Sequence, residues 1–481
     1  MMTPQAYEES LRELNLVVYM FGERIENVVD HPIIRPSMNA VAKTYELALR
    51  PEFEAIMTAR SHLTGRKVNR FTHVHQGIDD LINKSKMGRL LGRETGCCFQ
   101  RCVGTDALNA LSIVTYNIDE KHGTNYYKRF LKYLRYVQER DLTCDGAMTD
   151  PKGDRSLAPH KQADPDLFLR ILEERKNGIV VRGAKAHQTG AVNSHEIIAM
   201  PTIALGKEDQ DYAVAFAVPS NASGVLFVMG RQSCDTRKLE DGDIDTGNVL
   251  FGGHEALIVF DDVFVPWERV FMFREYEFAG QLVERFASYH RQSYACKVGV
   301  GDVLIGAAQT VAEYNGIEKT SHVKDKIIEM NHLNETLYCG CMACASEGHR
   351  EPSGTYAVDT LLANVHKQNV TRFPYEIARL AQDIAGGLLV TMPSEKDFTS
   401  PECGKWVNKY FRGRADVPTL DRMRILRLIE NITLGTAAVG YLTESMHGAG
   451  SPQAQRIMIS RYENMKEKQE AAKRLCRIEE A

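Results

Sequence analysis

Apolar residues recur at three- and four-residue intervals near both ends of the chain. In the first part, residues 1–140, this spacing is clear in HQGIDDLINKSKMGRLLGRE and NYYKRFLKYLRYVQERD. It is the period of an amphipathic helix, and Thr3 before Pro4 is typical of a helix start. The same period returns after about residue 276, as in VKDKIIEMNHLNETLY. The pattern therefore predicts helices at both ends of the chain.

The middle of the chain has a different pattern of residues. Short β-branched and aromatic runs occur there, including GIVVRGAKAH, HEIIAMPTIAL, YAVAFAVP and EALIVFDDVFVP. Gly- and Asp-rich turns such as FGGH separate these runs, which is typical of strands. We therefore expect an α+β fold with an N-terminal helical domain (1–140), a central β domain (141–275) and a C-terminal helical bundle (276–481).

Composition narrows the classes of function. The chain has 481 residues, 25% of them charged, and a net charge of −4. The sequence has no basic stripe of the kind that would indicate a nucleic-acid partner. The N-terminus lacks a signal pattern, and the apolar stretches are interrupted well short of a membrane span. We expect a cytoplasmic protein without membrane contact, whose eleven cysteines are thiols.

Three of these cysteines fall within ETGCCFQRCVGTDALNAL, residues 94–111. The segment is expected to be helical, so Cys98 and Cys102 would share one face and Cys97 would point elsewhere. Small buried thiols often simply pack a helix face. Packing and ligation both remain open for this group.

A second group lies in YHRQSYACK, residues 289–297. On a helix His290 and Tyr294 would share a face, with Cys296 and Lys297 close by. A helical bundle can bring this segment opposite Cys98, so the residues predict either a Cys/His metal site or a packed polar layer. A third cysteine group, CGCMAC at 339–344, is interpreted as packing.

Three further segments have the composition of ligand contacts. AMTDPKGDRS and VRGAKAHQTGAVNSHE place hydroxyl, carboxylate and amide groups beside glycine at strand ends. QDIAGG places two glycines in a helical region, where each costs about 1 kcal/mol relative to alanine. Ordinary loops and close approach of a ligand or another backbone are the two interpretations.

Taken together, these motifs resemble a known family. The order of elements, MTDPKGD, VFDDVFVP and QDIAGG are similar to the acyl-CoA dehydrogenase fold, a likeness shared with flavin-dependent aromatic hydroxylases of the 4-hydroxyphenylacetate type. The stretches CFQRCVG, GRQSCDTRK, ERFASYHRQSY and YLTESMHGAGSPQAQRIMI resemble more specifically the 4-hydroxybutyryl-CoA dehydratase family. This second resemblance runs from Met1 into the 460s.

The resemblance implies an enzyme that is both a lyase and an isomerase. Its reaction would be the radical dehydration of 4-hydroxybutyryl-CoA to crotonyl-CoA, with vinylacetyl-CoA Δ-isomerase activity, in an oxygen-sensitive homotetramer. FAD would supply one-electron chemistry and a [4Fe–4S] cluster a Lewis acid. The alternatives are an isomerase only, an FADH2-dependent aromatic monooxygenase on the same scaffold, and a zinc-stabilised scaffold that is not an enzyme.

The family's functional residues carry over by position. The cluster ligands would be Cys98, Cys102, His290 and Cys296. The catalytic residues would be His290 as base, Tyr294 and Glu444 at the leaving hydroxyl, and Glu255 and Lys297 in support of charge. The residues implied for FAD binding are Thr149, Asp150, Arg155, Gln188, Thr189, Gln382, Gly386 and Gly387, with Thr189 hydrogen-bonded to the flavin.

One spacing departs from the family pattern. His290 and Cys296 are six positions apart, whereas the family has seven. On a regular helix six positions turn the side chain about 120° away from the starting face. Either a π-bulge or helix break realigns Cys296, or this corner of the cluster is lost.

Overall fold

The N-terminal part of the chain is mainly helical. The computed structural model describes residues 1–151, 153–230, 242–244 and 250–478, so most of GRQSCDTRK (231–238) lies outside the described residues. Thr3 caps the first helix, since its hydroxyl accepts a hydrogen bond from the Ala6 amide at 3.1 Å. The helices of this part are α1 (Pro4–Glu13), α2 (Arg35–Leu49), α3 (Glu54–Met57), α4 (Ile78–Thr95), α5 (Cys102–His122) and α6 (Tyr126–Arg140).

Two larger sheets hold most of the strands. The six-stranded sheet has the order β2–β1–β10–β11–β7–β6 and the four-stranded sheet has the order β12–β9–β8–β5. Two short ribbons, β3–β4 and β13–β14, complete the strands of the described residues. Their bounds are β1 (Val18–Met20), β2 (Glu23–Arg24), β3 (Thr58–Arg60), β4 (Lys67–Asn69), β5 (Cys144–Ala147), β6 (Arg170–Arg175), β7 (Gly178–Thr189), β8 (Glu196–Ala199), β9 (Val214–Pro219), β10 (Val225–Met229), β11 (Glu255–Pro266), β12 (Val270–Phe273), β13 (His349–Arg350) and β14 (Tyr356–Ala357).

The expected helical region also contributes to the large sheet. Strand β1 pairs in parallel with β10, and Val18 lies opposite Phe227. Three residues are too few to show the period of a strand, and the partner of β1 lies about two hundred positions further along the chain. The sequence pattern therefore missed this strand, although the mixed α+β class is confirmed.

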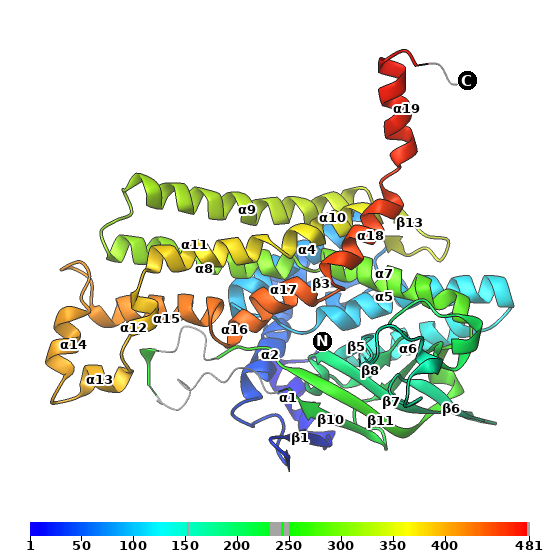
Figure 1. The fold of residues 1–481 in the computed structure, drawn as a ribbon. Helices are drawn as coiled ribbons and strands as arrows, with labels where there is room; N and C mark the ends of the chain where they lie inside the picture. The colour runs from blue at the N-terminus through cyan, green and yellow to red at the C-terminus, as the bar shows by residue number, and fades with distance from the viewer. Residues whose placement is uncertain (152, 231–241, 245–249, 479–481) are drawn as a thin grey trace.

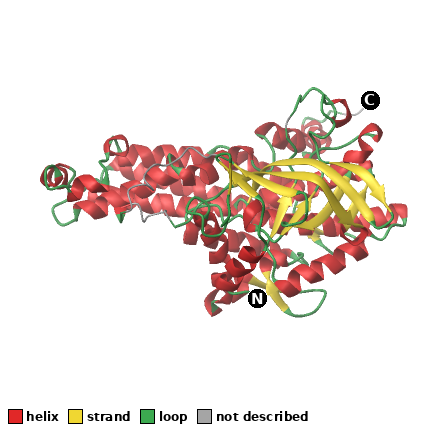
Figure 2. Ribbon diagram, turned by 90° about the horizontal axis from the view of Figure 1, so that it is seen from below, coloured by secondary structure: helices red, strands yellow, loops and turns green. Residues whose placement is uncertain are grey.

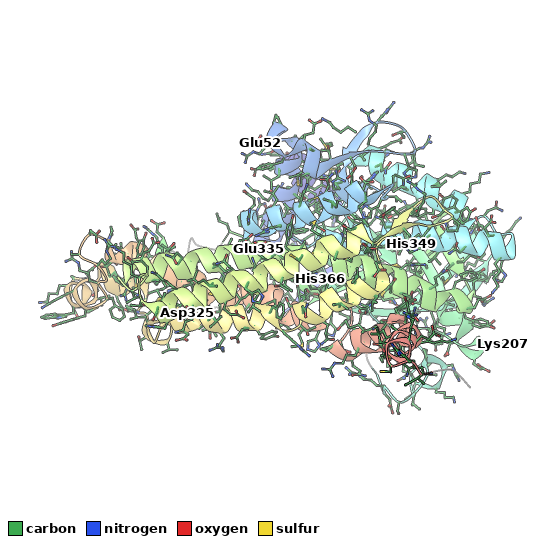
Figure 3. The ribbon with its side chains drawn as sticks, turned by 90° about the horizontal axis from the view of Figure 1, so that it is seen from above. Glu52, Lys207, Asp325, Glu335, His349 and His366 are labelled. Atoms are coloured by element: carbon green, nitrogen blue, oxygen red, sulfur yellow. The ribbon has the colours of Figure 1, made fainter. Side chains whose placement is uncertain are left out.

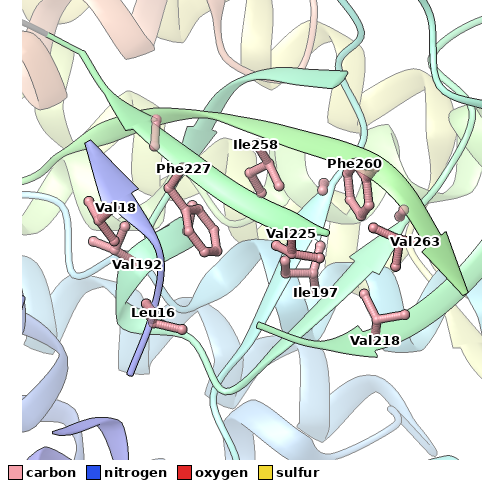
Figure 4. Close-up of a cluster of buried hydrophobic side chains, with 14 of the residues drawn as sticks. Leu16, Val18, Val192, Ile197, Val218, Val225, Phe227, Ile258, Phe260 and Val263 are labelled. Carbon is pink, nitrogen blue, oxygen red and sulfur yellow. The ribbon is translucent and has the colours of Figure 1, made fainter. Parts of the chain in front are cut away.

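The two larger sheets pack face to face. Ile197 and Val218 of the small sheet meet Phe227, Ile258 and Phe260 of the large sheet in one buried apolar cluster (Figure 4). Apolar side chains of both sheets interdigitate in such a sandwich. The large sheet is thereby fixed against the small one.

The other face of the small sheet packs against helices. Ile198 and Phe271 share a second apolar cluster with Ala107 of α5, Phe130 of α6 and Leu282 of α7. The small sheet therefore lies between the large sheet and the helices. Seen from below, both sheets occupy one end of an elongated molecule and helices extend from the other (Figure 2).

Helices α8, α9, α11 and α15 form the core of the C-terminal bundle (Figure 1). Among the described residues, the stretch Tyr276–Tyr314 is long and apolar enough to cross a membrane, but 72% of its most apolar window is buried, as in a core helix. The helices of this part are α7 (Ala279–Gln292), α8 (Ala295–Tyr314), α9 (Ser321–Ser346), α10 (Thr360–Val370), α11 (Phe373–Ala385), α12 (Leu388–Thr391), α13 (Glu395–Thr399), α14 (Gly404–Tyr410), α15 (Thr419–Thr433), α16 (Thr436–Ala438), α17 (Glu444–His447), α18 (Pro452–Tyr462) and α19 (Met465–Leu475).

Helix α4 joins the N-terminal helices to this bundle. Arg89 of α4 bonds to Asp302 of α8 at 2.9 Å and to Glu335 of α9 at 3.1 Å, and Glu335 lies on the side of the bundle that faces the N-terminal helices (Figure 3). The α4 and α8 backbones also approach closely, because a side chain at Gly92 would collide with the Cys296 carbonyl. This crossing brings Cys296 next to the helix that precedes Cys98.

We predict that Gly104→Ala destabilises the protein. A β-carbon at this position of α5 would collide with the Cys144 carbonyl of β5, and overpacking typically costs about 1–3 kcal/mol. The thermal unfolding midpoint should therefore fall. The matched control is Gly306→Ala in α8, where no atom lies within 4 Å of the new β-carbon and higher helix propensity should raise stability by up to about 1 kcal/mol. Equal midpoints for the two variants would contradict the close packing of α5 on β5.

Candidate functional site

The first cysteine group lies at a helix junction. Helix α4 ends at Thr95, Gly96 adopts the left-handed conformation with φ of 61°, and α5 begins at Cys102. Gln100 is also left-handed, with φ of 59°. The prediction that Cys98 and Cys102 share one helix face is therefore wrong, because Cys98 lies in the turn.

The junction nevertheless brings three thiols into one buried region. Cys98, Cys102 and Cys296 are free and buried, and Cys102 and Cys296 belong to the same apolar cluster as Phe99. Burial is the main cause that raises the pKa of all three thiols; a nearby carboxylate, Glu444 or Asp106, raises it further, and Lys297 lowers it. Cys98 interacts electrostatically with both of the other thiols. Such groups favour the neutral thiol until a cation is bound.

The second group contains the helix break that the six-residue spacing required. Helix α7 ends at Gln292 and α8 begins at Ala295, with Ser293 and Tyr294 between them. His290 and Tyr294 share a face, since their rings make an edge contact with centroids 5.5 Å apart. The break turns Cys296 toward the region of Cys98 and Cys102. Of the two alternatives for this spacing, the structure contains the irregularity.

His290 is held by a carboxylate that the sequence analysis missed. Asp106 accepts hydrogen bonds from His290 Nδ1 at 2.9 Å, Lys84 Nζ at 2.6 Å and Ser293 Oγ at 2.9 Å. One ligand atom each of Cys102, Asp106 and His290 lie within 4.8 Å of one another. Asp106 follows Cys102 by four positions on α5, and this spacing was a signal that could have found it.

A chain of proton-carrying groups lies next to the thiols. Thr189 Oγ1 lies 2.7 and 2.8 Å from the two Glu255 carboxyl oxygens and hydrogen-bonds to that carboxyl group, and Glu255 also hydrogen-bonds to Glu444. Lys297 Nζ donates to Glu444 Oε2 at 2.8 Å and to the Gly440 carbonyl. The structure therefore brings together four of the predicted residues from β7, β11, α8 and α17.

Burial and neighbouring charges shift the pKa values of the groups in this proton-carrying chain. Burial, and then the Glu444 charge, raise the pKa of Glu255 well above its ordinary value. Burial alone would lower the pKa of Lys297, but Glu444 and the nearby thiols raise it well above its ordinary value. Two adjacent carboxyl groups cannot both ionise easily. The neutral form of Glu255 and the charged form of Lys297 are therefore favoured.

Tyr294 lies between this chain and a second lysine. Its hydroxyl donates to the Glu444 backbone carbonyl at 3.1 Å. Lys367 Nζ lies 4.5 Å from the centre of the Tyr294 ring and donates to the Ser445 carbonyl. A π-helical turn, Val439–Thr443, directly precedes Glu444, and such turns often occur at functional sites.

Three of the predicted flavin contacts gather at the end of β5. The Thr149 carbonyl accepts from the Gln188 side chain at 3.1 Å, and Asp150 pairs with buried Lys185 at 2.8 Å. Lys185 Nζ also donates to the Met148 carbonyl at 2.9 Å. Thr189 follows Gln188 at the end of β7, so the predicted flavin contacts at the ends of β5 and β7 lie side by side.

The remaining predicted flavin residues lie elsewhere. Arg155 lies on an exposed turn. Gln382, Gly386 and Gly387 lie at the end of α11, and α12, which follows them, is at the end of the bundle away from the sheets (Figure 1). Nothing lies within 4 Å of a β-carbon built at either glycine. Within one chain, the structure does not bring these three residues to the rest of the site.

A buried aspartate near this site was also missed. Asp145 of β5 is 1% exposed, and neither carboxyl oxygen has a side-chain hydrogen-bond partner in the described ranges. Burial raises its pKa to about 8, and it interacts electrostatically with Glu255. Only the folded chain reveals this aspartate, since CDGAMTD has an ordinary alternation for a strand.

The donor set fits an iron–sulfur cluster. Such clusters are bound by cysteine thiolates, and histidine replaces cysteine in some of them. The three thiols are buried beside an imidazole, and a carboxylate holds that imidazole at Nδ1. Gly440 and Gly253 bring the backbone close to Cys98, since β-carbons built at them would lie 3.4 and 3.8 Å from Cys98 Cβ. In CGCMAC, Cys341 and Cys344 are buried and Cys339 is exposed, and Cys344 packs in an apolar cluster, which is consistent with the packing interpretation of that motif.

The chain belongs to the 4-hydroxyphenylacetate 3-hydroxylase family. The family's N-terminal sequence model matches residues 3–272 and its C-terminal model matches residues 279–477. The fold agrees, because the oxygenase component of 4-hydroxyphenylacetate 3-monooxygenase complexed with FAD superposes with a TM-score of 0.87 at 23% identity, over 99% of this chain and 98% of that one.

Two relatives place the chain in one branch of this family, the 4-hydroxybutyryl-CoA dehydratases. It is 63% identical to the 4-hydroxybutyryl-CoA dehydratase/vinylacetyl-CoA-Delta-isomerase of Clostridium aminobutyricum, over 99% of this chain and 100% of that one. It is 60% identical to the oxygen-tolerant archaeal 4-hydroxybutyryl-CoA dehydratase of N. maritimus, with a TM-score of 0.97 over 100% of this chain and 95% of that one. The predicted family resemblance is confirmed.

We predict that Asp145→Asn changes how stability depends on pH. Folded protein holds the Asp145 proton up to about pH 8, whereas the unfolded chain releases it near the ordinary value of 3.8. Between these values the group makes the free energy of unfolding fall as pH rises, by up to about 1.4 kcal/mol per pH unit. The asparagine variant has no such proton, so its stability relative to the unchanged protein should rise toward pH 8 and then level off.

Denaturant unfolding at several pH values measures this difference. Below pH 4 both side chains are neutral, so the difference there reports packing alone and serves as the internal control. A difference that stays constant from pH 4 to pH 9 would contradict the assignment.

Proposed function

We propose that this protein dehydrates 4-hydroxybutyryl-CoA to crotonyl-CoA and isomerises vinylacetyl-CoA, as a lyase and an isomerase. The observation that carries the proposal is the single buried region that holds three thiols, the His290–Asp106 pair and the chain from Thr189 to Lys297. Thiols and an imidazole can hold a Lewis-acidic metal cluster, and the neighbouring carboxyl and amino groups can transfer protons, which together suit the removal of water from an unactivated carbon. The identity to two named dehydratases over the full chain supports the same reaction.

We propose FAD and a [4Fe–4S] cluster as the cofactors. Cys98, Cys102, Cys296 and His290 would hold the cluster, and Thr149, Asp150, Gln188 and Thr189 would contact the flavin. When bound, the flavin supplies one-electron chemistry and the cluster a Lewis-acidic iron. The FAD complex of the related oxygenase supports the flavin, and the donor chemistry of the buried thiols supports the cluster.

Different residues of the protein would then carry out the separate proton transfers. His290 would be the base for the proton next to the thioester carbonyl only when its Nε2 is not holding the cluster, because Asp106 engages Nδ1 and leaves Nε2 available. Glu255, whose pKa is raised, can hand a proton to Glu444, and Lys297 pairs with Glu444. The Tyr294 hydroxyl, anchored at the Glu444 carbonyl, orients the leaving hydroxyl. Burial of these groups excludes bulk water from the reacting atoms.

We also propose a homotetramer in the cytoplasm that oxygen inactivates. Gly386 and Gly387 are exposed, and Val390, Trp406 and Tyr410 near them are 80%, 50% and 69% exposed. Such an apolar surface suits contact with another copy of the chain. The N. maritimus neighbour is described as oxygen-tolerant, so oxygen sensitivity needs its own test by activity decay in air.

The test is a cofactor and activity measurement on protein purified without oxygen. We expect about four irons, about four sulfides and one FAD per chain, with conversion of 4-hydroxybutyryl-CoA to crotonyl-CoA. Flavin without iron, together with vinylacetyl-CoA isomerisation alone, would favour the isomerase. Oxygen-dependent hydroxylation of a phenol would favour the monooxygenase, and zinc in a colourless protein would favour the scaffold.

We predict that Cys296→Ser and Cys97→Ser differ in iron content. Cys296 interacts with both other thiols, so its loss should remove at least about one iron in four. Cys97 is equally buried, but its thiol donates to the Cys98 carbonyl at 3.5 Å, so the serine variant should keep its iron. Both variants should keep FAD. Equal iron loss in the two variants would contradict the proposed ligand set.

A further inference from the structure

We propose that Asp106 is a positioning residue that holds His290 with its Nδ1 proton engaged and its Nε2 lone pair free to bind iron. The inference rests on the proposed function, in which His290 is a cluster ligand. It adds a role for Asp106 and for the two side chains that hold Asp106.

The geometry around His290 carries the first step. Nδ1 lies 2.9 Å from Asp106 Oδ2, and a carboxylate can only accept, so Nδ1 carries a proton, and in the neutral ring Nε2 then holds the lone pair. Phe286 stacks on the ring with centroids 5.7 Å apart and planes inclined by 22°. Across the described chain no hydrogen bond to Nε2 is found. The ring is therefore fixed in both orientation and tautomer.

Asp106 is itself held from two other elements. Lys84 of α4 donates to one carboxyl oxygen at 2.6 Å, and Ser293 donates to the other at 2.9 Å. Lys84 also donates to the Tyr289 carbonyl at the end of α7. The residue that follows α7, Ser293, thus belongs both to the helix break and to the support of His290. The break sets the direction of Cys296 and of His290 together.

Direct ligation by Asp106 is the competing interpretation, since its carboxylate lies within 4.8 Å of the Cys102 and His290 ligand atoms. The hydrogen bonds argue against it. Both oxygens already accept from donors, and the Lys84 ammonium at 2.6 Å would repel a cation there. A carboxylate that accepts from the far nitrogen of a metal-bound histidine is a common arrangement, and its loss typically lowers metal affinity or activity about 10- to 100-fold.

Asp106→Asn tests the inference. The amide nitrogen cannot accept a hydrogen bond, so one of the three donors loses its acceptor, and the amide can donate to Nδ1 instead. That exchange moves the ring proton to Nε2 and blocks the ligand atom. We expect iron loss to a chelator to be about 10- to 100-fold faster than in the unchanged holoenzyme, with FAD content unchanged.

A second readout follows the ring itself. In protein labelled with 15N-histidine, the His290 signals, assigned by difference from His290→Gln, should report an Nδ1–H ring in the metal-free unchanged protein. The Asp106→Asn variant should shift toward Nε2–H. This measurement does not need the cluster, so it tests Asp106 even if the unchanged protein proves to contain no iron and the proposed function fails.

Two further variants keep the test decisive. Asp80→Asn removes a hydrogen bond of the same kind and length, from His73 Nε2 at 2.9 Å, and should leave iron loss and the His290 signals unchanged. Ser293→Ala removes one support of Asp106 and should change both readouts in the same direction, by less. Unchanged chelator kinetics and an unchanged His290 tautomer in Asp106→Asn would overturn the inference.

Discussion

The buried ion pair between Lys84 and Asp106 is the contact on which the arrangement of the site depends. It joins α4 to α5, and through the Tyr289 carbonyl and His290 it joins both to the end of α7. Burial of two charges costs several kcal/mol per ion, and an ion pair of this kind is often worth little to stability. Its structural consequence is geometric: three helices meet at one carboxylate, and Cys102 lies beside it.

Close helix packing and helix irregularity work together around this pair. Gly92 of α4 has no side chain, so α8 can approach until the Cys296 carbonyl lies against this glycine. The break at Ser293 and Tyr294 then determines where Cys296 points. A continuous helix would place His290 and Cys296 on different faces. The shortened spacing and the break therefore compensate for each other.

The proton-carrying chain shows a different constraint. Thr189 and Glu255 are cross-strand partners in β7 and β11, whereas Glu444 and Lys297 come from the helical bundle. The chain therefore spans the boundary between sheet and bundle. Burial at this boundary raises the pKa of Glu255, and Lys297 pairs with Glu444.

Local periodicity predicted much of the architecture. The helices at both ends and the run of strands between them depend on side chains a few positions apart, so their pattern is visible in the sequence. The missed strand β1 and the wrong helical path from Cys98 to Cys102 have one cause in common. The first depends on a distant partner strand, and the second on two residues with positive φ, which apolar spacing does not reveal.

The sequence by itself determined the element types, the family and most of the chemical groups of the site. Tertiary structure decided which groups touch: Asp106 with His290, Glu255 with Glu444, and Cys296 with the Cys98 turn. It also decided that Gln382 and its glycines lie apart from the other flavin candidates within one chain. The physical reason is that side-chain identity and period are local properties, whereas contact, burial and the proton affinity they set arise only when distant segments pack.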